Sequence, residues 1–248
     1  MTIQMKNLKI KNDFNKDVIT LRGSIVQDNY FEEDIDLITP KAVDEALENA
    51  KSDNVEVVIN SGGGDVYASI EIYNKLKSLN KNITTVISGR AFSGAHLIAM
   101  AGKERLIYGN SQGLAHNSST VTWGNKEELA DVIDFLDKID DNLIEIYMNC
   151  FNGTEDELRE LMKKGSPMNA KECLEKGFAT RIIEFNNDEN KVVVNENSTN
   201  SKSDGVDIDV VVKRVLEVLN KTPDDKVEDN PKPEKNKDKS LFRYFKEA

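Results

Sequence analysis

Residues 55–65, VEVVINSGGGD, decide the fold, because a nearly continuous apolar run passes directly into three glycines. The apolar run, Val55 to Ile59, is typical of a parallel strand that is buried on both faces. The glycines, Gly62 to Gly64, predict a tight strand-to-helix turn in which backbone N–H groups can approach a ligand closely. Apolar residues at helical spacing follow between Ile70 and Leu79. The stretch therefore predicts a strand–turn–helix unit of an α/β protein.

The glycine turn alone is a weak functional signal, because ordinary tight turns also use glycine. No Lys-Ser or Lys-Thr pair follows the glycines, so the turn is not a nucleotide-binding P-loop. The full dinucleotide-binding fingerprint is absent as well.

Strands and helices alternate on both sides of this unit. The sequence predicts strands at 18–21, 83–87, 106–108 and 181–184, and helices at 39–51, 126–150, 155–164 and 169–177. This order favours an α/β fold with parallel pairing. The helix at 126–150 carries one apolar stripe and would be about 35 Å long. We weigh equally a helix that lies on its own sheet and one that also meets a partner.

The composition changes sharply after residue 185. We expect one domain over residues 1–185 and an acidic, largely disordered tail over 186–248. Within the tail, residues 206–220 could form a short amphipathic helix or an extended segment. Residues 241–245, LFRYF, form an aromatic peptide that either docks on a partner or is merely a sticky end.

Composition and charge exclude several classes of protein. No window approaches the 18 consecutive apolar residues of a membrane span, and the N-terminus lacks the apolar centre of a signal peptide, so we expect a cytoplasmic protein. A net charge of −11 argues against a nucleic-acid partner. The two cysteines, Cys150 and Cys173, lack metal-ligand spacing and are interpreted as buried thiols in a reducing compartment.

A serine and two histidines are the candidate catalytic side chains. Ser93 stands among small residues after a predicted strand, where the next backbone N–H could face an oxyanion. Taken alone, small residues at the start of a helix more often serve close packing. His96 lies three residues after Ser93, and His116 lies at the end of a predicted strand. Either histidine, taken alone, is more often structural. Together, the glycine turn, the serine and a downstream histidine supply the parts of acyl-transfer catalysis.

Four segments in this order resemble the proteolytic subunit of Clp proteases: residues 57–66, 89–95, 110–117 and 169–178. The resemblance covers roughly residues 16–185. It implies a spiral of βαβ units, as in the Clp peptidases and crotonases, with a long protruding interface helix. It also implies a serine endopeptidase. Asp65 and residues 123–125 look more like the phage-encoded branch, which matures phage heads by cleaving capsid or scaffold proteins.

The resemblance assigns roles to individual residues. Ser93 would be the nucleophile and His116 its base, and the backbone N–H groups of Gly64 and Gly94 would form the oxyanion hole. Gly63 and the segment that begins with Ser118, Ser119 and Thr120 would bind peptide as an added strand.

The resemblance also implies partners and a location. No cofactor and no metal are implied. The subunits would form a homo-oligomeric ring, heptameric or stacked in pairs, and the tail would reach capsid, scaffold or portal proteins. The protein would act in the host cytoplasm or within assembling proheads, with no membrane or nucleic-acid partner.

One departure from the family concerns the third catalytic residue. The position that carries the family's Asp or Glu is Gly165, with Ser166 and Glu160 as the nearest polar substitutes. A triad without its acid can lose about four orders of magnitude in rate. A milder departure is Gly62, which replaces the family's proline.

Two alternatives to an active protease follow. The first is a catalytically impaired assembly or scaffold homologue of the same fold, which Gly165 favours. The second is an acyl-CoA hydratase or isomerase, against which the spacing of Ser93 and His116 argues.

Overall fold

The computed structural model describes residues 4–5, 8–12, 15–27, 36–185 and 192–195. Two compact units, residues 1–200 and 201–248, make up the chain, and every described residue belongs to the first. The amphipathic segment and the aromatic peptide predicted in the tail lie outside the described residues.

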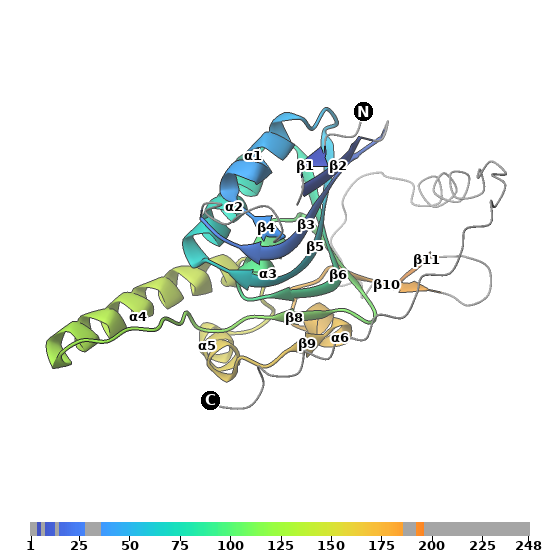
Figure 1. Ribbon diagram of the computed structural model, residues 1–248. Helices are drawn as coiled ribbons and strands as arrows, with labels where there is room; N and C mark the ends of the chain where they lie inside the picture. Colours follow the sequence, from blue (N-terminus) through green and yellow to red (C-terminus); the bar gives the residue numbers. More distant parts are fainter. Residues whose placement is uncertain (1–3, 6–7, 13–14, 28–35, 186–191, 196–248) are drawn as a thin grey trace, which may run out of the picture. The chain divides into compact units, whose positions relative to one another are not determined.

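A mixed sheet forms the centre of the molecule (Figure 1). Its middle strands run parallel in the order β3-β5-β6-β7-β10. Their bounds are β3 Asp17–Ile25, β5 Asn54–Gly64, β6 Asn82–Phe92, β7 Glu104–Tyr108 and β10 Arg181–Phe185. The α/β prediction with parallel pairing is therefore confirmed.

The outer strands on both sides of the sheet pair antiparallel, which was not predicted from the sequence. On one side β1 (Gln4–Met5) pairs with β2 (Leu8–Asn12), which pairs with β3. On the other side β11 (Val192–Asn195) pairs with β10. These segments join neighbouring strands through short connections, which allow antiparallel pairing, whereas parallel pairing needs a crossover.

Side-chain caps set the starts of the helices. Thr39 accepts a hydrogen bond from Ala42 N at the start of α1 (Pro40–Glu48), and Asp65 accepts one from Ala68 N at the start of α2 (Val66–Ser78). Reciprocal capping boxes begin three further helices, α4 (Lys126–Met148), α5 (Glu155–Lys164) and α6 (Ala170–Glu175). The predicted helix boundaries agree with these to within about three residues, because the cap residues are visible in the sequence.

The core lies between the sheet and the helices that cover it. Alternate residues of β3 and β5 point into it, including Ile19, Val57 and Ile59. The short helix α3 (Gly94–Ala99) is buried along its whole length. Because α3 follows β6 directly, its N-terminus is held rigidly at the end of the sheet.

The predicted ends of two central strands were wrong. We expected strands that end at Ile59 and Ile87, but β5 continues to Gly64 and β6 to Phe92. The reason is that β3 also continues, so that Ile25 pairs with Gly64, and Ser61 pairs with Ala91. The glycine segment and the segment before Ser93 therefore end side by side, at the C-terminal ends of the central parallel strands.

Two short strands were not predicted, because two residues carry no periodicity. They are β4 (Leu37–Ile38) and β9 (Met168–Asn169). The strand predicted to end at His116 is present as β8 (Gln112–Leu114), which ends two residues earlier. The important one is β8, which runs parallel to the last residues of β6 and antiparallel to β9.

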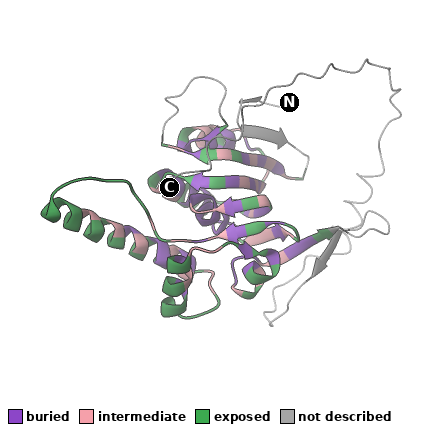
Figure 2. Ribbon diagram, turned by 60° about the horizontal axis from the view of Figure 1, so that its bottom comes forward, coloured by how far each residue is buried: buried purple, intermediate pink, exposed green. Residues whose placement is uncertain are grey.

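The longest helix, α4, extends beyond the sheet together with the irregular segment that precedes it (Figure 1). Its buried residues, Ile139, Leu143, Ile144 and Tyr147, all lie in its C-terminal half. The outer half is mostly exposed (Figure 2). We call residues 117–135 the arm. Within the described ranges, no helix has the length and apolar character needed to cross a membrane.

Candidate active site

Ser93 occupies a sharp turn between β6 and α3. Its backbone has φ 56° and ψ −128°, and among the described residues it is the sole non-glycine with positive φ. Such strain persists only where the surroundings impose it, and it is a recognised feature of nucleophilic serines between a strand and a helix. The Ser93 N–H donates to the Leu114 carbonyl at 2.8 Å, and the Ser93 carbonyl accepts from His96 N and Leu97 N. Its side chain makes no cap hydrogen bond, so the hydroxyl is left available.

Glycines pack closely around this turn. Gly63 has φ 94°, and a Cβ atom there would lie 2.5 Å from the Phe92 carbonyl oxygen and 2.7 Å from Ser93 Cβ. A Cβ atom at Gly94 would overlap with the Ser69 hydroxyl on α2. The glycine segment therefore packs against the turn at Ser93. The backbone at position 63 comes so close to Phe92 and Ser93 that only glycine fits there.

His116 lies two residues beyond β8 and is held from several sides. Before it, Leu114 pairs with Phe92 of β6. After it, Asn117 N donates to the Met162 carbonyl of α5 at 3.3 Å, and Ser118 N donates to Asp140 Oδ1 of α4 at 2.6 Å. The backbone around His116 is thus tied to β6, α4 and α5, and the residue as a whole is half-buried.

One cavity of about 460 Å³ brings the candidate residues together. Ser93, His116, Gly64 and Gly94 line it, as do Ser118, Ser119 and Thr120. Gly63 is not among its lining residues and lies behind Ser93. Apolar side chains supply much of the rest, among them Leu97, Ile139, Leu143 and Tyr147. A nucleophile, a base and backbone donors that share an apolar cavity are the parts needed for acyl transfer.

Gly165, the expected position of the acid, is adjacent to the base. It ends α5 in the left-handed conformation (φ 55°, ψ 39°), and a Cβ atom there would lie 3.3 Å from His116 Cβ. Glu160 is 77% exposed and lies 4.0 Å from Lys163, so it is not directed toward the base. In the described part of the chain, no carboxylate forms a hydrogen bond with the His116 ring.

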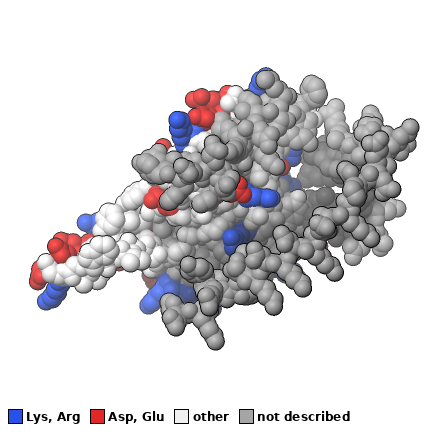
Figure 3. Space-filling model, viewed as in Figure 1, with Lys and Arg blue, Asp and Glu red and all other residues white. Residues whose placement is uncertain are grey.

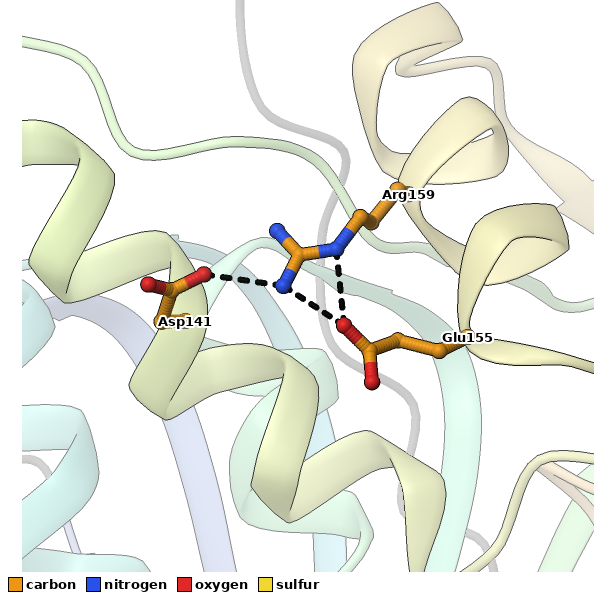
Figure 4. A network of polar contacts seen from close by, with 3 residues as sticks. All are labelled: Asp141, Glu155 and Arg159. Carbon is orange, nitrogen blue, oxygen red and sulfur yellow. Dashed lines mark hydrogen bonds and ion pairs between the residues drawn. The ribbon is translucent and has the colours of Figure 1, made fainter.

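An exposed ionic network connects α4 and α5, the two helices that bind the backbone directly after His116 (Figure 4). Arg159 of α5 donates to Glu155 on the same helix and to Asp141 on α4 at 2.9 Å. Hydrogen bonds to these two carboxylates raise the pKa of Arg159. Because the network is solvent-exposed, we expect it to contribute little to stability.

The other histidine, His96, belongs to the core. Its ring packs between Tyr147 and Phe178, with centroid distances of 5.5 and 4.9 Å, and its Nδ1 lies 3.3 Å from the Tyr147 hydroxyl. Its Nε2 has no hydrogen-bond partner among the described residues. Burial lowers the pKa of His96 to about 3, so the ring stays neutral. The structure therefore separates two histidines that the sequence left equivalent, and His116 is the one in the cavity.

Asp140 was missed in the sequence, although a signal was present. It lies four residues after Leu136 and three before Leu143, on the apolar stripe of α4, where a charged residue is unexpected. Its carboxylate anchors the segment that follows His116. The charged side chain on an apolar helix face could therefore have identified Asp140 as a residue with a hydrogen-bond partner.

Comparison with known proteins agrees with this geometry. The profile of the Clp protease family matches residues 10–186. The ATP-dependent Clp protease proteolytic subunit of Deinococcus radiodurans is 27% identical over 132 residues, which is 52% of this chain and 65% of that protein. The same subunit of Lactococcus lactis is 27% identical over 146 residues, which is 57% of this chain and 72% of that protein. The match thus spans slightly less than two thirds of the first relative. Since the family profile covers most of the chain, this protein belongs to the Clp protease family.

Proposed function

We propose that the chain is a serine endopeptidase of the Clp proteolytic-subunit type. The observation that carries the proposal is the strained turn at Ser93, which leaves the hydroxyl uncapped beside a cavity that His116 also lines. Strain of this kind at a half-buried serine has no evident packing benefit, and it serves to expose a nucleophile.

The proposed reaction proceeds in two steps. Ser93 Oγ attacks the peptide carbonyl while His116 takes its proton, and the backbone N–H groups of Gly64 and Gly94 stabilise the oxyanion. His116 then gives the proton to the leaving amine. Water, activated by the same histidine, hydrolyses the acyl-enzyme. The segment 118–120 is suited to hold the substrate as an added strand, because it lines the cavity outside any regular element.

The missing acid predicts a slow enzyme. Without a carboxylate on its ring, His116 depends for orientation on the backbone contacts of its neighbours, Leu114, Asn117 and Ser118. The second candidate function is a catalytically impaired assembly homologue, and Gly165 is the observation that favours it.

The arm supports the proposal that the subunits associate. It exposes several large apolar residues: Val121 at 92%, Trp123 at 89%, Ile133 at 60% and Phe135 at 50%. The face of the arm visible in Figure 3 is largely uncharged. Apolar surface of this kind usually marks a protein interface. We therefore propose that the arm is the interface helix of a homo-oligomeric ring built from spiral βαβ domains.

The biological setting is proposed on the resemblance alone. Asp65 and the residues around Trp123 favour a phage or prophage protease that cleaves capsid or scaffold proteins in the host cytoplasm. The tail would provide contacts with those proteins.

The test combines chemical labelling with mass analysis. Purified full-length protein is treated with a fluorophosphonate, and its intact mass is followed over time beside Ser93→Ala. A single adduct on the wild type and none on Ser93→Ala is the expected result. Trimming within residues 186–248 that is lost in Ser93→Ala would add proof of peptide-bond cleavage. No adduct on either protein, with both folded, would establish the inactive homologue instead.

A further inference from the structure

The cavity at Ser93 carries a single fixed charge. Among the described residues that line it, Asp65 is the sole Asp, Glu, Lys or Arg side chain. The other lining groups are apolar, hydroxyl or amide groups, apart from the ring of His116. Asp140, whose carboxylate accepts from the lining residue Ser118, lies behind the lining and has the same sign of charge. A charge that lines a largely apolar binding site acts most directly on any charged substrate group that enters.

Asp65 is also fixed in position, close to the reacting atoms. It directly follows Gly64, whose backbone N–H is proposed for the oxyanion hole. The Asp65 N–H donates to the Ile25 carbonyl at 2.9 Å, and Asp65 Oδ1 accepts from Ala68 N at 2.8 Å at the start of α2. Its second carboxylate oxygen makes no hydrogen bond to the described residues. The residue is exposed, so this oxygen is free to meet a substrate side chain.

The environment limits how strong the effect can be. The positive end of the α2 dipole and the bond from Ala68 offset part of the carboxylate charge. Solvent at the cavity mouth screens another part. The remaining field still favours a cation over an anion, because no lysine or arginine of the described cavity lining neutralises it.

We propose that Asp65 makes this site select peptides with lysine or arginine beside the scissile bond and reject those with glutamate or aspartate there. The proposal rests on the proposed peptidase function, which it deepens by naming the class of substrate. Asp65 is here a specificity-determining residue, and it takes no proton in the reaction.

The experiment uses full-length protein and two sets of fluorogenic peptides. One set varies the residue before the scissile bond and the other varies the residue after it. The varied residue is lysine, glutamine or glutamate. The Asp65→Asn variant is the matched control, because asparagine keeps the side-chain volume and caps a helix as well as aspartate does. Asp65→Ser, which also caps, guards against a folding defect of the first variant. Thermal unfolding establishes that both variants are folded.

For the wild type we expect kcat/KM for the lysine peptide to exceed that for the glutamate peptide by about tenfold at low ionic strength, and the ratio to shrink as salt is added. In both variants the ratio should fall severalfold toward one, whatever their overall rate, because the Asp140 carboxylate behind Ser118 is retained. Cleavage of all three peptides at equal kcat/KM by the wild type would overturn the selection by Asp65 and leave the peptidase intact. No cleavage of any peptide and no fluorophosphonate adduct would overturn the peptidase, and the selection with it.

Discussion

The two sides of the catalytic cavity are built in different ways. On the nucleophile side, the backbone fixes Ser93 through three hydrogen bonds and through glycines packed behind it. On the base side, His116 has no side-chain partner in the described part of the chain, and the nearest helix end offers it a glycine, Gly165.

This difference separates two requirements of a serine peptidase. Exposing the nucleophile is a property of the fold, because it follows from strand pairing and close packing. Orienting the base depends on single side chains, and here the carboxylate expected at position 165 is missing. Variants on each side test two statements: that packing holds Ser93 rigidly, and that His116 lacks a side chain to orient it.

The largest effect is expected from Gly63→Ala. The new methyl group would lie 2.5 Å from the Phe92 carbonyl oxygen and 2.7 Å from Ser93 Cβ, at a φ of 94° that alanine rarely adopts. Displacing a nucleophile by about 1 Å can cost roughly a hundredfold in rate. We expect a loss of fluorophosphonate labelling of at least that size. The free energy of unfolding should fall by about 2–4 kcal/mol in urea denaturation.

The neighbouring glycine supplies the control. A Cβ atom at Gly62 would meet only the Arg90 side chain, at 3.6 Å. Gly62→Ala should therefore change labelling and stability little. Equal losses in the two variants would mean that the packing behind Ser93 is not what holds it.

Some residues of this site could be predicted from the sequence and others could not. Ser93 and the glycines were singled out by residue identity and order, but each segment alone also fitted ordinary packing, and the family resemblance assigned their roles. His116 was preferred over His96 only through the family resemblance, because burial by Tyr147 and Phe178 depends on tertiary packing. The prolongation of β5 and β6 was missed for a similar reason, since a glycine run reads as a turn unless the strand beside it, β3, continues.

His96 lies in the core against Tyr147, a lining residue of the cavity, and offers a test of this buried region through pH. Its pKa of about 3 lies below the ordinary value of 6.5. The unfolded chain therefore takes up a proton between pH 6.5 and about 3 that the folded protein does not. The contribution to stability is lost as the pH falls through this window, by up to about 1.4 kcal/mol per pH unit.

The measurement is urea denaturation at several pH values, wild type beside His96→Leu. Carboxylates also titrate in this range, so the quantity of interest is the difference between the two proteins. We expect the variant to lose less stability than the wild type as the pH is lowered. Parallel curves would show that His96 is not kept neutral by the fold.

On the base side, Gly165→Asp should increase activity. A Cβ atom at this position lies 3.3 Å from His116 Cβ, so a carboxylate attached to it is within reach of the ring. Aspartate also tolerates the left-handed conformation of this residue better than most side chains. We expect the rate of fluorophosphonate labelling to rise about tenfold, a small part of the factor of about 10⁴ that an ideal acid supplies.

Gly165→Asn is the matched variant, because it has the same shape and backbone preference without the charge. It should not raise the labelling rate, and both variants should lose about 1 kcal/mol of stability to backbone strain. An equal gain with asparagine would assign the effect to contact with His116 rather than to an acid.

The smallest expected effect concerns Asp140, the carboxylate that holds the base side together indirectly. Its bond to Ser118 N is short, at 2.6 Å, and fixes the chain two residues after His116. Removing the carboxylate in Asp140→Ala leaves that N–H without its partner, and it loosens both the base and the segment 118–120 proposed to hold the peptide. We expect kcat/KM to fall about fivefold to tenfold, with part of the loss in KM, because both functions share the same anchor. Asp140→Asn keeps an acceptor oxygen at the same place and should recover most of the loss. If asparagine were as defective as alanine, the charge of Asp140 would matter more than its hydrogen bond, and the base side would then be supported by electrostatics rather than by the position of the backbone.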